Sequence, residues 1–233
     1  MNITKPSLFP TKQTKIIATI GPATSSSEML EQLLLAGMNV IRINASHGDH
    51  DTHKKVIDNI RKLDEELGSH TSILVDLQGP KLRVGEIDGE EMELEEGSEL
   101  RIKVGSKMGS NGVIYTNYES FAKDVKSGEP VLLDDGKLRL EVISSDNDSE
   151  VVCKVIYGGT LKPRKGLNLP KTMISLPCIT EKDEADLAFA LKNNVDWVGL
   201  SFVRNPDDIL VLRKKIKAEE KHTRIVAKIE KPE

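Results

Sequence analysis

Segments with strand and helix patterns alternate through the first third of the chain, and this alternation limits the possible folds more than any other feature. Apolar strands are expected over residues 14–20, 38–46 and 72–78. Between them, apolar side chains recur at helical spacing, first after a capping box of Ser25 and Glu28 and again from about Asp51. Such a series is typical of a parallel sheet covered by helices.

The pattern changes after residue 79. Short strand-like segments separated by Gly, Asn, Asp and Ser turns predominate there, and only residues 118–126 look helical. The expected strands cover residues 81–88, 92–104, 131–134, 138–144 and 150–161. This part of the sequence predicts a mostly β insertion, folded as a compact barrel or sandwich.

The alternation returns after Pro177, with a helix capped by Thr180, a strand at residues 196–203, a helix from Pro206 and a strand at residues 224–230. The sequence therefore predicts an α/β fold, a partial (β/α)8 TIM barrel (first five strands) with an inserted all-β barrel domain after strand 3. The expected domains are residues 1–78 and 177–233 for the barrel and 79–176 for the insertion. Because closure needs eight strands and no helix follows before Glu233, we expect a truncated barrel, with an open sheet as the alternative.

Composition argues against several partners. A net charge of −4 disfavours nucleic acid and anionic membranes, and a 3% aromatic content leaves few platforms for stacking bases. The sequence shows neither an apolar signal-peptide core near its start nor a stretch of membrane-spanning length. Cys153 and Cys178 have apolar neighbours in the sequence, which predicts core thiols in a reducing compartment and a cytoplasmic location.

Polar and ionisable side chains share one face of three expected strands, close to where each strand ends. The sets that share a face at the two-residue period are Val40, Arg42, Asn44 and Ser46; Leu74, Asp76 and Gln78; and Val226, Lys228 and Glu230. Buried charges cost several kcal/mol unless they are paired or used, so this pattern indicates an active site. A structural ion pair between Arg42 and Asp76, or between Lys228 and Glu230, is the alternative for each cation.

Several motifs resemble those of the pyruvate kinase family, in the same order and at fitting intervals. They are TKIIATIGP at 14–22, GMNVIRINASHG at 37–48, DLQGPKLR at 76–83, KGLNLP at 165–170, SFVR at 201–204 and KIE at 228–230. The resemblance runs from about Lys15 to the last residue. It implies a (β/α)8 barrel with a mobile β domain inserted after strand three. It also implies transfer of the phosphoryl group of phosphoenolpyruvate to ADP, giving pyruvate and ATP in glycolysis.

The resemblance implies roles for individual residues. Arg42 would hold the transferred phosphoryl group, Lys228 would neutralise charge on the phosphoryl oxygens and the enolate, and Glu230 would bind Mg²⁺ or Mn²⁺. Residues that would bind substrate or nucleotide are His47, Arg83, Lys165, Ser201 and Phe202. The second carboxylate ligand of the metal and the proton donor to the enolate are expected beyond Glu233.

Asn44, Ser46 and Asp76 resemble the monovalent-cation ligands of the family, which normally bind K⁺. Many members have Thr after the matching Asp and Glu in a Gly-Pro-Glu motif, whereas this chain has Leu77 and Lys81. A lysine ammonium can supply the charge that K⁺ otherwise supplies, so we predict that K⁺ is not required. The alternative is that Lys81 only faces solvent.

Two other functions remain open at this point. A phosphoenolpyruvate/pyruvate-type barrel lyase would use Lys228 to form a Schiff base, and a non-catalytic fragment would only bind nucleotide or a full-length partner. The resemblance implies phosphoenolpyruvate and ADP/ATP as ligands, and a homotetramer for the full-length form. Because about half of the family's catalytic apparatus is present, we expect residues 1–233 alone to be inactive.

Overall fold

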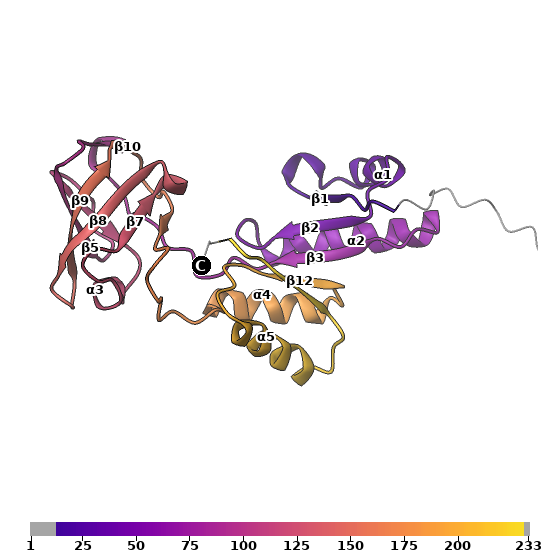
Figure 1. Cartoon of the computed structure of the whole chain (residues 1–233). Helices are drawn as coiled ribbons and strands as arrows, with labels where there is room; N and C mark the ends of the chain where they lie inside the picture. Colours follow the sequence, from indigo (N-terminus) through magenta and orange to yellow (C-terminus); the bar gives the residue numbers. More distant parts are fainter. Residues whose placement is uncertain (1–12, 231–233) are drawn as a thin grey trace, which may run out of the picture. The chain divides into compact units, whose positions relative to one another are not determined.

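The computed structural model describes residues 13–230, which divide into two compact units (Figure 1). The first unit contains the chain up to Gly79 together with Cys178–Glu230, and the second contains Pro80–Pro177. The expected domain limits at residues 1 and 233 lie outside the described residues.

A five-stranded parallel sheet forms the centre of the first unit, in the order β1-β2-β3-β12-β13. Its strands are β1 (Ile17–Thr19), β2 (Val40–Asn44), β3 (Ser72–Asp76), β12 (Trp197–Leu200) and β13 (Arg224–Ala227). Their order in space follows their order in the chain, which is the pattern of a (β/α) barrel and not of a doubly wound sheet. The α/β class and the five expected strands are confirmed, and within residues 13–230 the sheet is open.

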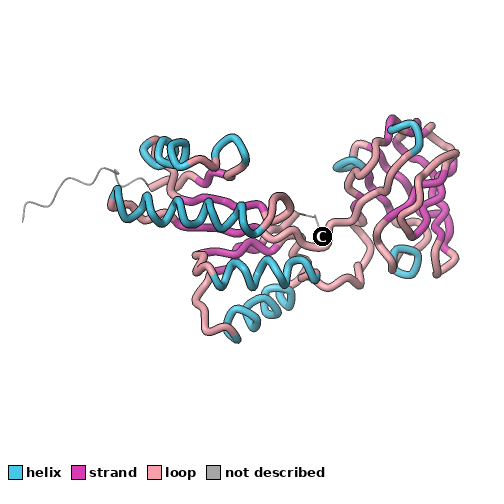
Figure 2. The backbone as a smooth tube through the Cα atoms, turned by 180° about the vertical axis from the view of Figure 1, so that it is seen from behind, coloured by secondary structure: helices cyan, strands magenta, loops and turns pink. Residues whose placement is uncertain are grey.

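Four helices accompany this sheet: α1 (Ser27–Leu35), α2 (His50–Leu67), α4 (Glu181–Lys192) and α5 (Pro206–Ala218). A 3-10 turn, η1 (Pro22–Thr24), precedes α1. Figures 1 and 2, which view the molecule from opposite sides, place α2, α4 and α5 on one face of the sheet. Among residues 13–230, no helix has both the length and the hydrophobicity that crossing a membrane requires.

The start of α1 corrects one sequence expectation. The N-cap is Ser26, whose side chain accepts a hydrogen bond from the backbone N–H of Met29. The hydroxyl of Ser25 instead donates to the carbonyl of Pro22 at 3.3 Å, because the intervening 3-10 turn brings these residues together. The predicted cap of α4 is confirmed, since Thr180 and Asp183 form a reciprocal capping box.

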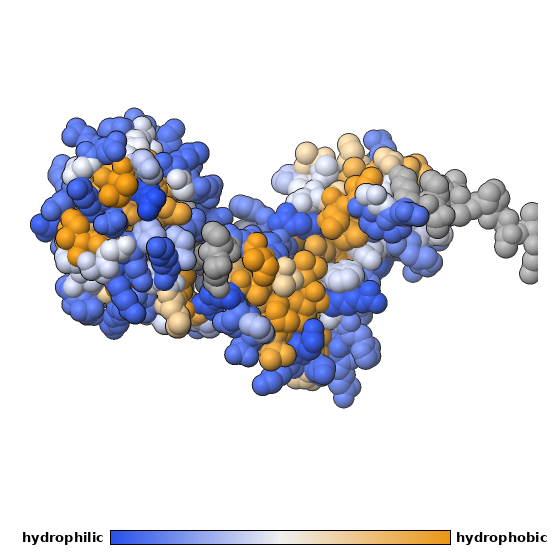
Figure 3. Space-filling model, viewed as in Figure 1, coloured by the Kyte–Doolittle hydropathy of each residue, from blue (hydrophilic) through white to orange (hydrophobic). Residues whose placement is uncertain are grey.

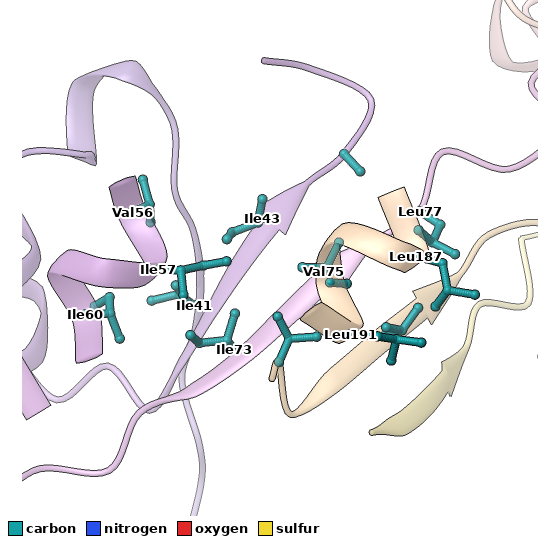
Figure 4. Close-up of a cluster of buried hydrophobic side chains, with 14 of the residues drawn as sticks. Ile41, Ile43, Val56, Ile57, Ile60, Ile73, Val75, Leu77, Leu187 and Leu191 are labelled. Atoms are coloured by element: carbon teal, nitrogen blue, oxygen red, sulfur yellow. The ribbon is translucent and has the colours of Figure 1, made fainter. Parts of the chain in front are cut away.

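The hydrophobic core of the first unit lies between the sheet and its helices. Figure 4 shows Ile41 and Ile43 of β2 facing Ile57 of α2, while side chains of α4 cover β3 and β12. Ile41 and Ile43 are buried and the intervening Arg42 is partly exposed, so the predicted alternation of β2 is confirmed. Figure 3 shows a hydrophobic band across the visible face of this unit.

Two sheets and one short helix make up the second unit. The larger sheet has the order β11-β7-β8-β9-β5-β6, and β10 pairs with β4 in the smaller one. The strands are β4 (Met92–Leu94), β5 (Glu99–Val104), β6 (Val113–Thr116), β7 (Pro130–Leu133), β8 (Leu138–Ser145), β9 (Glu150–Tyr157), β10 (Gly159–Leu161) and β11 (Leu167–Asn168). The mostly β character is confirmed, while closure into a barrel stays a prediction.

Three sequence expectations for this unit were wrong in detail. Residues 81–88 form only isolated bridges, at Arg83, Val84 and Ile87, because each pairs with a different part of the chain. The short strands β6 and β11 were not expected. The expected helix at residues 118–126 is reduced to α3 (Phe121–Asp124), since Val125 already has extended backbone angles.

Both cysteines are buried and unpaired, as predicted. Burial raises the pKa of the Cys153 thiol to about 12 and also raises the pKa of Cys178. At pH 8 both thiols therefore stay protonated, and we expect neither to react with a disulfide reagent such as DTNB while the chain is folded. Both should react after unfolding in guanidinium chloride. A thiol that reacts in the folded chain as fast as free cysteine would contradict this prediction.

Candidate active site

Asp76, at the end of β3, is the centre of a cluster of charged and polar side chains. Its side chain is only 3% exposed and accepts hydrogen bonds from Arg42 Nε at 2.8 Å and Nη2 at 2.6 Å. Lys228 Nζ lies 3.0 and 3.1 Å from the two carboxylate oxygens. The hydroxyl of Ser201 accepts a bond from the same ammonium at 2.8 Å and donates to the carbonyl of Leu77 at 2.6 Å. Two cations thus share one buried carboxylate.

The parallel sheet explains why these groups meet, since the carboxyl ends of neighbouring parallel strands lie at one edge. Asp76 is aligned with Asn44 of β2 on one side and with Gly199 of β12 on the other. A Cβ on Gly199 would lie 2.9 Å from Asp76 Oδ1, so the absence of a side chain leaves room for the carboxylate. Thr19, at the end of β1, accepts a bond from Arg42 Nη1 at 2.9 Å.

Sequence reasoning missed Thr19 and Gly199. The signal for Thr19 was its place at the end of an expected strand, where a hydroxyl can meet the polar groups of the next strand. For Gly199 the only signal was a glycine within an apolar strand, which often marks close approach of another group.

Glu230 lies beside the two cations but is more exposed. Its Oε1 is 3.4 Å from Lys228 Nζ, and its Oε2 accepts a bond from the backbone N–H of Phe202 at 3.0 Å. Phe202 has a φ of 56°, a left-handed conformation that is rare for a bulky residue and is often found at functional sites. The backbone of Phe202 therefore helps to fix the Glu230 carboxylate.

The residues present fit a divalent cation only in part. Within residues 13–230 no group of three or more His, Cys, Asp and Glu side chains is arranged to hold a metal ion. Glu230 can supply one hard oxygen ligand, and Mg²⁺ is commonly bound by one or two carboxylates together with water and substrate oxygens. Glu230 can thus be one ligand of such an ion but does not form a site by itself.

The remaining predicted residues of the first unit lie near the end of β2. Asn44 Oδ1 accepts a bond from the backbone N–H of Ser46 at 3.1 Å, and Asn44 is the ladder neighbour of Asp76. His47 is exposed in the turn that leads into α2. The structure therefore brings Asn44 next to Asp76, while His47 lies at the surface.

The other predicted basic residues belong to the second unit. Lys165 Nζ is 2.8 Å from Asp134 Oδ1, and Lys137 Nζ is 3.0 Å from Asp134 Oδ2. Hydrogen bonds from Lys165 and then Lys137 lower the pKa of the Asp134 carboxyl. Arg83 Nη1 donates to the carbonyl of Arg164 at 2.8 Å, and Lys81 is exposed. Arg83 and Lys165 are therefore tied to other groups of the same unit.

Comparison with known proteins identifies the family of this fold and site. The sequence matches the family model "Pyruvate kinase, barrel domain" over residues 11–233. The chain belongs to the pyruvate kinase family. The resemblance found in the sequence motifs is thereby confirmed.

Individual pyruvate kinases show how much of such a protein the chain represents. It is 45% identical over 224 residues to the pyruvate kinase of Staphylococcus saprophyticus, covering 95% of this chain and 38% of the relative. It is 42% identical over 223 residues to the pyruvate kinase of Staphylococcus aureus strain USA300, with the same coverage. A solved pyruvate kinase structure from Cryptosporidium parvum superposes with a TM-score of 0.86 at 38% identity, covering 94% of this chain and 46% of that one. The chain thus spans less than half the length of these relatives.

Proposed function

We propose that the pyruvate kinase to which this chain corresponds transfers the phosphoryl group of phosphoenolpyruvate to ADP, forming pyruvate and ATP. The observation that carries this proposal is the pairing of Arg42 and Lys228 on one carboxylate at the carboxyl end of the sheet. Two fixed cations at one edge of a sheet suit a small substrate that carries both a phosphate and a carboxylate.

Arg42 would bind and orient the phosphoryl group. Its guanidinium is fixed in plane by Asp76 on one side and by Thr19 on the other. A planar guanidinium held in this way can present its remaining N–H groups to phosphoryl oxygens without losing orientation. This placement lowers the entropic cost of aligning donor and acceptor.

Lys228 would stabilise the negative charge that moves from the phosphoryl group to the enolate. Its ammonium is held by Asp76 and Ser201, so it needs little rearrangement to face an anion. A divalent cation bound by Glu230 would supply further neutralisation of oxygens on the phosphoryl group and the enolate. Most of the catalysis would then come from placement and charge neutralisation.

We also propose that residues 79–176 act as a lid that carries Arg83 and Lys165 to the nucleotide. Exclusion of water would protect the phosphoryl donor from hydrolysis. By similarity to the family, the full-length form would be a homotetramer.

A chimera tests the proposed reaction. In it, this chain replaces the matching segment of the Staphylococcus saprophyticus pyruvate kinase, and pyruvate formation from phosphoenolpyruvate and ADP is followed by coupled NADH oxidation. Activity of the chimera supports the proposal, and a folded chimera without activity contradicts it. The chain alone is expected to be inactive in the same assay. Borohydride trapping with pyruvate tests the lyase alternative, because only a Schiff base would be trapped.

We expect the activity of this chimera not to depend on K⁺, because Lys81 would supply the positive charge and Leu77 lacks the hydroxyl of a potassium ligand. Replacing K⁺ by tetramethylammonium at constant ionic strength should leave the rate nearly unchanged. The double variant L77T/K81E restores the residues common in the family and should become K⁺-activated. Strong K⁺ activation of the unaltered chimera would refute the proposed role of Lys81.

A further inference from the structure

The cap of α4 uses one more oxygen than capping requires. Asp183 is fully buried, and its Oδ2 accepts bonds from the backbone N–H of Thr180 at 2.9 Å and from its hydroxyl at 2.6 Å. These bonds complete the capping box. The second oxygen, Oδ1, accepts a bond from the backbone N–H of Gly79, 104 positions earlier in the chain, at 3.1 Å. Asp183 therefore joins the start of α4 to the segment that follows β3.

Gly79 is in close contact with the turn that follows β12. Its φ is +68°, and a Cβ at this position would lie 3.0 Å from the side chain of Phe202 and 3.0 Å from the Cβ of Ser201. Because such distances are shorter than normal contacts, the backbone of Gly79 lies directly against both residues. Holding Gly79 in place thus limits where Phe202 can move.

Phe202 in turn contacts the proposed metal ligand. Its backbone has a φ of 56°, and in this conformation its N–H donates to Glu230 Oε2 at 3.0 Å. An uninterrupted series of contacts therefore leads from Asp183 through Gly79 and Phe202 to Glu230. All four residues belong to the first unit.

We propose that Asp183 is a positioning residue for Glu230. By holding the N–H of Gly79, it keeps Gly79 against Phe202 and maintains the left-handed backbone from which Phe202 orients the Glu230 carboxylate. The importance of this orientation rests on the role given to Glu230 in the proposed function. The competing explanation is that Asp183 only caps α4, and the two explanations differ in what happens at Phe202.

Amide hydrogen exchange of the full chain, measured by NMR, separates them. The variant Asp183→Asn keeps the shape of the side chain but removes one of its two acceptor oxygens. We expect the Phe202 amide to exchange about tenfold faster relative to the amide of Val198, in the centre of β12. The matched variant Thr180→Ala weakens the cap but leaves the Gly79 bond, so this ratio should stay unchanged. An equal ratio in the two variants would overturn the proposal.

A second pair of variants tests the contact between Gly79 and Phe202 with Asp183 intact. Gly68 has nearly the same backbone angle, φ +67°, but a Cβ at Gly68 would meet no atom within 4 Å, so Gly68→Ala reports strain alone. We expect Gly79→Ala, and not Gly68→Ala, to accelerate exchange at Phe202. Similar exchange in both would overturn the proposal even if Asp183→Asn fails to fold. Neither measurement uses substrate, so its failure is distinguishable from failure of the turnover assay.

Discussion

Replacing Asp76 with alanine is expected to lower the free energy of unfolding of the first unit by about 3 kcal/mol. The carboxylate is almost fully buried and binds both Arg42 and Lys228, so its removal leaves two cations close together without a shared counter-charge. The value lies at the low end for breaking a buried ion pair, because the two side chains are 29% and 27% exposed and water screens part of their repulsion.

Urea denaturation followed by tryptophan fluorescence measures this effect in the relevant unit. The chain has a single tryptophan, Trp197, which lies on β12 of the first unit. Asp58→Ala is the matched control, since Asp58 pairs with Lys54 on the surface of α2, and such pairs contribute about 0.5 kcal/mol or less. A loss at Asp76 no larger than at Asp58 would show that the cluster does not stabilise the fold.

The faces of the strands could be predicted from the sequence because two independent signals agree there. In β2, the alternation that places Ile41 and Ile43 in the core also places Arg42 and Asn44 on the opposite face. The prediction that Arg42 and Lys228 meet at one edge followed from this alternation and from the geometry of parallel strands. Both cations bind Asp76, so this part of the candidate site is confirmed as an arrangement, while its chemistry remains a proposal.

Contacts between distant segments could not be predicted in the same way. The bond between Asp183 and Gly79 depends on how α4 packs beside β3, and no local pattern records it. Boundaries were limited by a different cause. Ser25 and Ser26 carry the same hydroxyl, and only the backbone path through η1 decides which of them caps α1. The four-residue strand β6 was missed because so short a segment has little periodicity.

Replacing Lys228 with methionine in the chimera is expected to lower kcat about a thousandfold, because the variant loses a fixed charge that faces the transferring group. Methionine approximates the length of the lysine stem, and Arg42 would still bind Asp76 through two hydrogen bonds. The fold should therefore persist, which urea denaturation of the variant can verify. The measurement is the steady-state rate at saturating phosphoenolpyruvate and ADP.

Lys217→Met is the matched control for this variant, since Lys217 is exposed in the last turn of α5 and its loss removes the same charge away from Asp76. We expect the control to retain its rate within about twofold, as surface charges screened by salt contribute little. If Lys228→Met retained more than about a tenth of the rate, less than about 1.4 kcal/mol of transition-state stabilisation would depend on the ammonium. Charge neutralisation by Lys228 would then not be a main source of catalysis, and Arg42 would have to supply most of it.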